Sequence, residues 1–502
     1  MRKNPSYQKE KRKFMAKILI IGGGVAGLSA GIYAQRLGHQ ATVCEKHFIA
    51  GGNLCGWDRG DYHIDNCIHW LTGTNPVTKT YKMWEELGAL GGVEIFQGES
   101  LFTCEYEGKR LALYKDIEKM QDEMLAVSSE DEKEIRSFIK AIRVLQGFCG
   151  IGGKKHDEKI SFFQAITGIP VLMKYYRLTT GELSERFSHP LLKFFFKAFW
   201  GDDFSSLALI FVCAHFCGEN GGIPAGSSCA MAERMTERFR SLGGKLLLKK
   251  EAVSIHHENG KATEVAFTDG TSLQADYIVL TADPASVFGK MTEISMPKQL
   301  KKFYQNSRFQ RFSSYQCAIS CTLSELPFEG DIIFEIPKEY QELLCTDRLI
   351  VREFAHEKTF SPDGKNILQT MTFVFEEKAK EFIRLRETER EAYLRKKKEM
   401  QEVLLKLIED QFPQMKGTLQ CIDLWTPATY HRFTGSEMGS FMSFALPSKA
   451  LPLRVGNRVN GLSNVILATQ WQQAPGGLPI AAETGKIAAQ TIDKEEKSKK
   501  RL

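Results

Sequence analysis

Long apolar runs are missing from this chain of 502 residues. The longest candidate, Leu207–Cys217, is shorter than the roughly 20 apolar residues that a membrane-spanning helix needs, and it contains His215. The basic stretch before the first apolar strand has no signal-peptide core, so we expect a cytoplasmic protein. Both ends of the chain are basic, which allows peripheral contact at the inner face of an anionic membrane; solvated tails are the alternative.

Paired cysteine motifs are missing as well. The 12 cysteines form no C-x-x-C, and neither Cys213 with Cys217 nor Cys317 with Cys321 has the second pair that a zinc site needs. This pattern is typical of a reducing compartment, and we expect no metal. The formal net charge is only +6, and the basic residues form no stripe interleaved with aromatic ones, so nucleic acid is not an expected partner.

A glycine motif stands near the start of the chain. Lys17–Ile21 is a short apolar run, and Gly22, Gly24 and Gly27 follow at the spacing G-x-G-x-x-G before an alanine-rich segment with helical periodicity. This order predicts a strand, a tight turn and a helix. The first glycine permits the turn, the second lets the backbone approach a pyrophosphate, and the third lets helix and strand pack closely. The helix N-terminus then offers free N–H groups to a phosphate.

A carboxylate completes this unit. The apolar segment Ala41–Cys44 predicts a second strand, and Glu45 follows it, 18 residues after Gly27, where a carboxylate can accept hydrogen bonds from ribose hydroxyls. The backbone amides of Gly51 and Gly52 are close enough in sequence to reach the same ligand. Together these features favour a dinucleotide site over a glycine-rich turn without function.

Five polar residues alternate along the next extended segment: Asp61, His63, Asp65, Cys67 and His69. On a strand they would share one face, which suggests a metal site. However, neighbours on one face stand roughly 7 Å apart and diverge, so we do not expect them to converge on one ion.

The middle of the chain interrupts the dinucleotide pattern. Residues from about 101 to 225 are predicted to be mainly helical, and their segment Leu191–Trp200 is unusually aromatic, which suits a core helix, the wall of an apolar tunnel or a membrane-facing patch. Dinucleotide-type signals return with a helix over Ser228–Leu242 and a buried strand in Ala275–Pro284. Later, Glu387–Asp410 predicts one long charged helix before Pro413.

Four motifs then carry a resemblance: GGGVAGLSAGIYAQRLGHQATVCEK; GGNLCGWDRGDYHIDNCIHWLTG; GGIPAGSSCAMAERM leading to GGKLLLKKEAVSI; and TPATYHRFTGSEMGSFMSF leading to APGGLPIAAETG. Over nearly its whole length the chain resembles the FAD-dependent phytoene desaturase, carotenoid isomerase and retinol saturase family. The resemblance implies an α/β fold with a glutathione-reductase-type (Rossmann-like) FAD-binding domain, discontinuous in sequence, and an inserted α+β substrate domain. We assign residues 15–100, 226–290 and 426–493 to the FAD-binding domain, and residues 101–225 and 291–425 to the substrate domain.

The resemblance also implies a role for particular residues. Glu45 would bind the adenosine ribose, the backbone of Val253 the adenine edge, and the helix starting near Leu478 the pyrimidine end of the isoalloxazine, where its dipole favours reduced flavin. The chain departs from the family pattern at Asn53, where relatives carry arginine, at Thr469, where an acid is common, and at Asn66-Cys67, which replace small residues. The residues expected to bind FAD are Gly22, Gly24, Gly27, Glu45, Lys46, Gly51, Gly52, Val253, Ala282, Thr469, Gly476, Gly477, Leu478 and Pro479.

The activity implied is that of an FAD-dependent desaturase, saturase or isomerase, which exchanges hydride at carbon–carbon bonds of a hydrophobic polyene or unsaturated lipid-like substrate. Its electron donor or acceptor is not specified. His69 and Tyr430 are the catalytic candidates; a structural hydrogen bond and a packing role, respectively, are the alternatives. Two other hypotheses stay open: a flavin amine-oxidase-like enzyme, and a non-enzymatic binding protein of the GDP-dissociation-inhibitor type.

Overall fold

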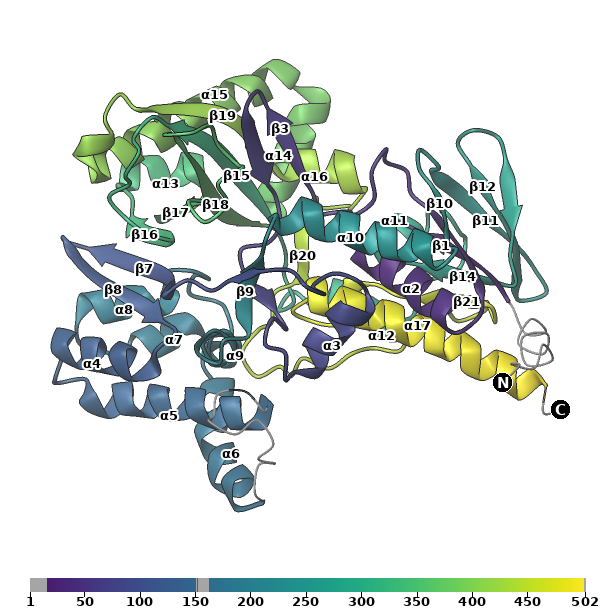
Figure 1. The fold of residues 1–502 in the computed structure, drawn as a ribbon, viewed down its shortest axis with the longest axis horizontal. Coiled ribbons are helices and arrows are strands. Elements are labelled where there is room, and N and C mark those ends of the chain that lie inside the picture. Colours follow the sequence, from purple (N-terminus) through teal and green to yellow (C-terminus); the bar gives the residue numbers. More distant parts are fainter. Residues whose placement is uncertain (1–15, 150, 152–161, 501–502) are drawn as a thin grey trace, which may run out of the picture.

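The computed structural model describes residues 16–149, 151 and 162–500. It has two halves that meet along the middle of the molecule (Figure 1). One half contains the glycine motif and the C-terminal helix, and the other contains a large sheet with helices around it. Within the described residues, no helix combines the length and the apolar character needed to cross a bilayer.

The first half is built on a parallel sheet of five strands in the order β10-β2-β1-β14-β21. The strands come from three separate parts of the chain, as the predicted discontinuous domain requires, and the strands predicted at residues 17–21, 41–44 and 275–284 are confirmed. Their bounds are Lys17–Ile21 for β1, Gln40–Cys44 for β2, Lys245–Leu247 for β10, Tyr277–Leu280 for β14 and Val465–Leu467 for β21.

Alternating side chains of these strands bury both faces of the sheet. Ile18 and Ile20 of β1 pack in one core with helices α2 (Val25–Arg36), α10 (Ser227–Ser241) and α17 (Leu478–Lys499). The odd-numbered neighbours on the same strand pack in a second core with the antiparallel meander β11-β12-β13, which covers the other face. The meander strands are Ala252–Glu258, Lys261–Phe267 and Ser272–Gln274, joined by two hairpin turns at Asn259-Gly260 and near Gly270.

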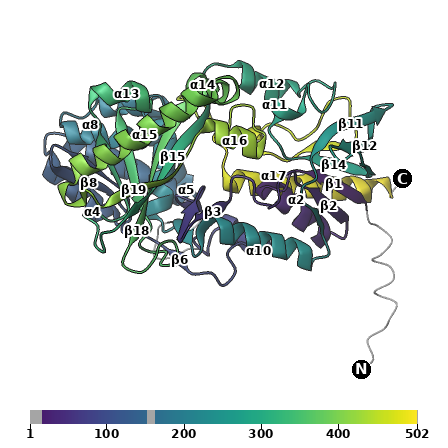
Figure 2. The same ribbon diagram turned by 90° about the horizontal axis from the view of Figure 1, so that it is seen from above.

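Small residues let the helices of this half approach closely. Helices α2 and α17 run side by side (Figure 2). A Cβ on Gly485 of α17 would lie 2.3 Å from the carbonyl oxygen of Ala26 on α2, and a Cβ on Gly31 would lie 2.6 Å from the Phe239 ring of α10. The helix packing therefore depends on the absence of side chains at these two positions.

The second half is organised by an eight-stranded sheet in the order β19-β15-β18-β17-β16-β7-β8, with β20 also paired to β15. Only β16 and β7 are parallel within it. The strands are β7 (Ser100–Tyr106), β8 (Lys109–Tyr114), β15 (Arg311–Cys321), β16 (Asp331–Glu335), β17 (Arg348–Glu353), β18 (Asn366–Phe375), β19 (Leu419–Trp425) and β20 (Ser440–Phe444).

Two expectations for this half need correction. Residues 101–225 are not helical from their start, because β7 and β8 form a hairpin whose turn residues Glu107 and Gly108 both have positive φ, as a type I′ turn requires. The predicted single helix Glu387–Asp410 is also wrong. It is divided between α14 (Glu376–Thr388) and α15 (Arg390–Gln411), since Glu389 leaves the helical conformation with φ −137° and ψ 58°.

A helical layer covers one end of the second half. Every leucine and phenylalanine of α8 (Pro190–Lys197) is buried, which confirms the core-helix interpretation of the aromatic segment. The other helices are α4 (Ile117–Val127), α5 (Glu132–Cys149), α6 (Phe162–Tyr176), α7 (Thr180–Ser184) and α9 (Ser206–Cys217). Short elements complete the fold: α3 (Lys79–Glu86), α11 (Pro284–Val287), α12 (Lys298–Gln305), α13 (Lys338–Leu344), α16 (Pro427–Thr434), η2 (Pro413–Met415), η3 (Gln470–Gln472), β3 (Gly56–Arg59), β4 (Tyr62–Asp65), β5 (Leu71–Thr72), β6 (Ile95–Phe96) and β9 (Gly221–Pro224).

The contact between α2 and α17 generates a prediction about stability. We expect Gly485→Val to lower the free energy of unfolding by about 2–3 kcal/mol, because the new side chain must push α17 away from the α2 backbone. The midpoint of thermal unfolding measures this change. The control is Gly91→Ala, where an added methyl group meets nothing within 4 Å. Equal midpoints for the two variants would contradict the proposed close packing.

Candidate active site

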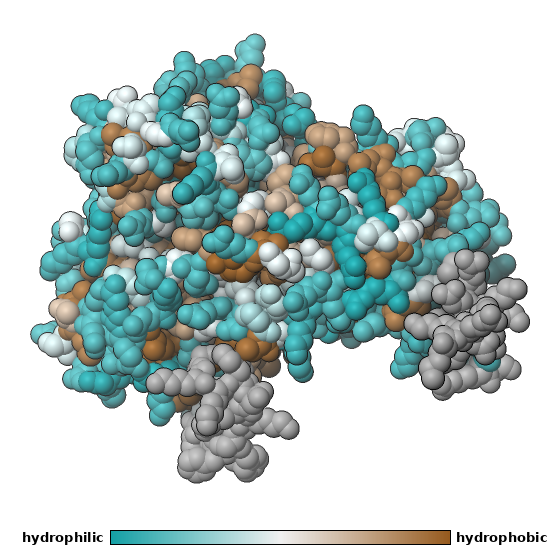
Figure 3. All heavy atoms as spheres, in the orientation of Figure 1, coloured by the Kyte–Doolittle hydropathy of each residue, from teal (hydrophilic) through white to brown (hydrophobic). Residues whose placement is uncertain are grey.

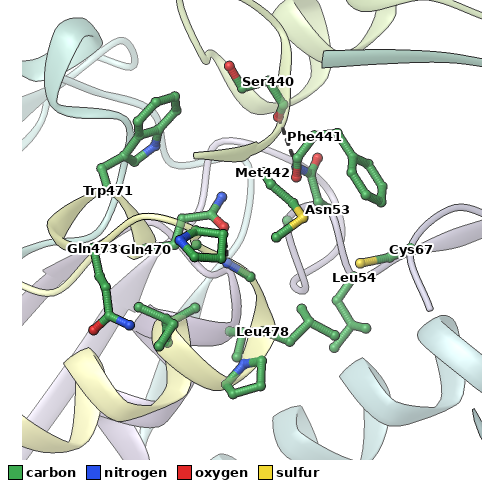
Figure 4. Close-up of a pocket in the computed structure, with 18 of the residues that line it drawn as sticks. Asn53, Leu54, Cys67, Ser440, Phe441, Met442, Gln470, Trp471, Gln473 and Leu478 are labelled. Carbon is green, nitrogen blue, oxygen red and sulfur yellow. Dashed lines mark hydrogen bonds between the residues drawn. The ribbon is translucent and has the colours of Figure 1, made fainter. Parts of the chain in front are cut away.

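A continuous cavity of about 610 Å³ lies between the two halves. Figure 4 shows part of its wall, where Asn53, Leu54 and Cys67 come from the N-terminal segment and Leu478 from the start of α17. The cavity brings together residues that the sequence placed in one site from segments hundreds of positions apart. The predicted residues that line it are Gly22, Gly24, Glu45, Gly51, Gly52, His69, Ala282, Thr469, Gly476, Gly477, Leu478 and Pro479.

The N-terminus of α2 forms one side of the cavity. Gly22 has φ +105°, and a Cβ on Gly27 would lie 1.9 Å from the Gly22 carbonyl oxygen, so both glycines are required by the backbone itself. Gly24 caps the helix without a side-chain hydrogen bond, and the first turn carries no acidic residue. The free N–H groups and the positive end of the helix dipole are therefore available to an anionic ligand.

The N-terminus of α17 reaches the same cavity. Gly477, with φ +118°, precedes the helix and provides no side-chain cap, and its own N–H donates to the Gln470 side chain at 2.9 Å. Ser29 of α2 donates to the carbonyl oxygen of Ala482 of α17 at 2.6 Å, which fixes the two helices relative to each other. Two positive helix ends thus face one cavity, an arrangement that suits a ligand with a pyrophosphate and a second group that carries negative charge.

Glu45 lines the cavity and also supports the glycine loop. Its two carboxylate oxygens accept hydrogen bonds from the N–H groups of Gly23, at 2.6 Å, and His47, at 2.9 Å. Each oxygen keeps a further lone pair for a ribose hydroxyl. The N–H of Gly51, which we expected to reach the ligand, instead donates to the carbonyl oxygen of Gly23 at 2.9 Å. Gly51 therefore holds the loop in place, while Gly52 lies beside it in the cavity wall.

Asn53 and Asn66, which depart from the family pattern, belong to one hydrogen-bond network. The Asn53 amide donates to the carbonyl oxygens of Ser440 and Phe441 at 3.2 and 3.1 Å (Figure 4). Asn66 in turn donates to the Asn53 carbonyl oxygen at 2.9 Å and accepts a hydrogen bond from the Tyr430 hydroxyl at 2.8 Å. The network connects the segment Gly51–Asn53 to strand β20 and helix α16.

Tyr430 itself is enclosed by this network. Its hydroxyl oxygen also accepts hydrogen bonds from Gln316 at 2.8 Å and Trp425 at 3.0 Å, and burial raises the pKa of the phenol. Tyr430 is not among the residues that line the cavity. The hydroxyl is thus fully occupied by protein partners in this structure, an arrangement that fits the packing alternative.

His69 lies in the cavity wall. Burial, followed by the nearby charge of Arg352, lowers its pKa well below the usual value, so the imidazole is neutral at physiological pH. Its Nε2 atom has no hydrogen-bond partner among the residues that the structure describes. Arg352 is held in a buried ion pair with Asp331 at 2.6 Å and donates to the carbonyl oxygen of Ile68 at 3.2 Å. A neutral, unpartnered imidazole is therefore fixed beside the cavity.

Three other predicted residues do not line the cavity. Gly27 lies beneath the glycine loop, as its packing role requires. Lys46 points toward α16, where its Nζ lies 3.4 Å from the carbonyl oxygen of Arg432. The Val253 side chain, on β11, is 42% exposed. Some cavity residues were not predicted individually as site residues: Thr281, Phe441, Met442, Gln470 and Trp471. The only sequence signal for them is their position within or next to the recognised motifs.

The part of the cavity away from the glycine loop is a chamber with apolar walls. Phe199 and Trp200, at the end of the aromatic segment, line it, so the tunnel-wall hypothesis holds for the end of that segment and the core hypothesis for its helix. The rest of the chamber wall comes from α5, α6, α9, strand β18 and neighbouring loops, through Leu145, Leu172, Phe204, Leu207, Ala208, Phe211, Val212, Met371 and Phe373.

Among the described residues that line the cavity, Glu45 and Asp283 are the only carboxylates. Asp283 is buried, which raises the pKa of its carboxyl group, and it accepts hydrogen bonds from Tyr304 at 2.7 Å and Ser436 at 2.9 Å. Both carboxylates are thus engaged by the protein on the nucleotide side. The described residues of the chamber wall therefore offer no free carboxylate to a cationic substrate.

Comparisons with known proteins identify the family of the chain. The model of the flavin containing amine oxidoreductase family matches residues 25–493. A 4,4'-diapophytoene desaturase from Methylomonas sp. is 20% identical, with 95% of each chain covered, and the chloroplastic prolycopene isomerase of Daucus carota is 20% identical, with 84% of this chain and 71% of the relative covered.

Solved structures share the fold. An oxidoreductase from Methanosarcina mazei has a TM-score of 0.60 at 15% identity, covering 95% of this chain and 100% of that chain. Cyclohexylamine oxidase from Brevibacterium oxydans has a TM-score of 0.56 at 14% identity, covering 96% and 99%. These identities are low enough that the likeness concerns the fold alone.

The expected resemblance, the α/β fold and the FAD cofactor are confirmed by these findings together. The two uncapped helix ends, the glycine loop and the carboxylate of Glu45 form a cradle that fits FAD. Because the family model spans nearly the whole chain, the protein belongs to the flavin containing amine oxidoreductase family and is an FAD-dependent oxidoreductase.

Proposed function

We propose that this enzyme exchanges hydride between FAD and a carbon–carbon bond of a hydrophobic polyene or unsaturated lipid-like substrate, as a desaturase, a saturase or an isomerase. The observation that carries the proposal is the apolar chamber, which is continuous with the FAD cradle and in which the described lining residues include no free carboxylate. Such walls favour a long uncharged molecule over an amine, because an ammonium group would enter without a partner for its charge. Two relatives named above, a desaturase and an isomerase, support the same substrate class.

The proposed roles of the cradle residues follow their positions. The N-terminus of α2 would hold the FAD pyrophosphate, Glu45 the adenosine ribose, and the N-terminus of α17 the pyrimidine end of the isoalloxazine. Bound flavin supplies a hydride acceptor or donor. The protein holds this group beside the chamber and excludes water through the apolar walls.

His69 is proposed as a neutral group that orients the substrate or the flavin. Its unpartnered Nε2 and its place in the cavity wall support this role. Tyr430 is proposed as a positioning residue, because its hydroxyl holds Asn66, which in turn holds the backbone of Asn53 in the cavity wall. Neither role requires a change of charge during the reaction.

We also propose that the enzyme works at the cytoplasmic face of a membrane, where an apolar substrate dissolves. Leu172 and Phe211 line the chamber, and their neighbours on the outer surface include Ile169 and Met173 of α6, which are 52% and 39% exposed. One face of the molecule, drawn in Figure 3, has apolar patches at the helical layer and between the two halves, among mostly hydrophilic residues. An apolar surface beside the chamber suits transfer from a bilayer.

The test of the substrate class uses the flavin as its own reporter. Anaerobically reduced enzyme should be reoxidised by polyenes or unsaturated lipids, or oxidised enzyme bleached by their saturated partners, while simple amines leave the absorbance of the oxidised flavin unchanged. Stopped-flow absorbance measures both directions. Bleaching by an amine, with no response to any apolar alkene, would contradict the proposed carbon–carbon chemistry.

A charge in the chamber should separate substrate binding from cofactor binding. We expect Leu207→Asp to lower kcat/KM for the apolar substrate at least about tenfold, because a carboxylate in the apolar wall must be desolvated when the substrate enters. The FAD content, measured by absorbance, should stay at the wild-type level. Leu394→Asp, at a position that is 48% exposed on α15, is the control and should leave both quantities unchanged.

The lowered pKa of His69 predicts a dependence of stability on pH. Below about pH 6.5 an unfolded histidine takes up a proton, whereas folded His69 does not, because its pKa is lowered. As the pH falls, each such histidine therefore lowers the free energy of unfolding by up to about 1.4 kcal/mol per pH unit. His69→Gln removes this loss. Urea unfolding between pH 7.5 and 5.5 should therefore show the variant gaining stability relative to wild type as the pH falls. His257→Gln, at an exposed position on β11, is the matched control substitution. If the difference in free energy of unfolding between His69→Gln and wild type stays constant over this pH range, the result contradicts a buried neutral imidazole.

A further inference from the structure

Two cysteines on adjacent strands of the eight-stranded sheet lie in contact. Cys317 is on β15 and Cys421 is on β19, and their sulfur atoms are 3.4 Å apart. The antiparallel pairing of these strands shifts register between Ala318 and Ile319, where Ile319 faces Cys421. Neither cysteine lines the FAD and substrate cavity. The pair is therefore a separate feature that the proposed chemistry does not use.

The two thiols have different surroundings. Cys317 is fully buried, whereas Cys421 is partly exposed at the edge of the sheet. The hydrogen bond between the sulfur atoms lowers the pKa of Cys421 and raises that of Cys317, and Lys397 and Gln401 of α15 also favour the Cys421 thiolate, while partial burial and Asp423 oppose it. The more accessible sulfur is thus the better nucleophile, and the buried sulfur keeps its proton beside it.

We propose that Cys317 and Cys421 are a reversible oxidation site, which closes to a disulfide when the protein meets hydrogen peroxide. The geometry carries this inference, because the sulfur atoms already touch and Cys421 is partly exposed. The inference does not depend on which substrate the flavin oxidises or reduces.

The chemistry balances in two steps. The Cys421 thiolate attacks one peroxide oxygen, the O–O bond breaks, and a sulfenic acid and hydroxide form. The Cys317 sulfur then attacks the sulfenic sulfur, the S–S bond forms, the S–O bond breaks, and the thiol proton leaves with the hydroxyl group as water. The two sulfur atoms lose two electrons, which reduce the peroxide to water and hydroxide. A dithiol reverses the bond by thiol–disulfide exchange.

The crosslink would act on the wall of the active site through β19. This strand has β15 as its sheet partner and ends at Trp425, whose indole N–H donates to Asn66 at 2.9 Å. Helix α16, with Tyr430, follows directly. A disulfide would tie β19 to β15 and fix the segment from which Trp425 and Tyr430 hold Asn66.

The experiment treats the purified FAD-loaded protein with hydrogen peroxide, removes the peroxide with catalase, and alkylates remaining thiols in denaturant. We expect the loss of two alkylation sites and a peptide pair joining Cys317 to Cys421 in an unreduced digest, both reversed by dithiothreitol. In Cys317→Ser, dimedone should trap a sulfenic acid on Cys421. Cys321→Ser, a buried cysteine on the same strand β15, is the control and should retain the crosslink.

Three results would overturn the inference. They are a crosslink between other cysteines only, full alkylation of Cys317 and Cys421 after peroxide has oxidised other thiols, and an unchanged crosslink yield in Cys421→Ser. Because Cys421 is partly exposed, serine is expected to be tolerated there. Before the peroxide treatment, circular dichroism and FAD content show whether each variant is folded. If Cys421→Ser is not folded, Cys421→Ala takes its place.

Discussion

The site depends on two helix N-termini held side by side against one cavity. Helices α2 and α17 come from opposite ends of the chain, and Gly485 and the hydrogen bond from Ser29 to Ala482 allow them to touch. Neither helix end has a side-chain cap, so both direct free N–H groups and positive dipole ends to the cavity. The FAD cradle exists because this packing sets both ends in place at once.

The second half of the molecule supplies what the cradle lacks. The cradle is polar and generic, since the same helix ends can hold a flavin in enzymes of unlike chemistry. The chamber walls from α5, α6, α9 and β18 are apolar. The network of Asn53, Asn66 and Tyr430 connects the wall segment at Asn53 to helix α16. Under the proposed function, the second half would determine the substrate class, and the half with the parallel sheet would determine the position of the flavin.

The sequence alone predicted the parts of this structure that local chemistry determines. The glycine spacing, the first two strands and Glu45 were predicted because each has a backbone or hydrogen-bonding requirement that few other residues meet. The β7–β8 hairpin was missed because its Glu107-Gly108 turn is a weak signal, and the break at Glu389 has no glycine or proline to mark it. Pairings between distant segments, such as Asn53 with β20 and Cys317 with Cys421, depend on strand register and could not be predicted from one chain.

The visible spectrum of the purified protein, with its cofactor released by heat and identified, tests most directly whether the cavity binds FAD. The account predicts the absorption of bound flavin, the release of FAD, and loss of the bound cofactor when Gly24→Val places a side chain between the α2 N-terminus and the pyrophosphate. A colourless protein that also fails to bind added FAD would contradict it, and the cavity would then have to hold a different ligand.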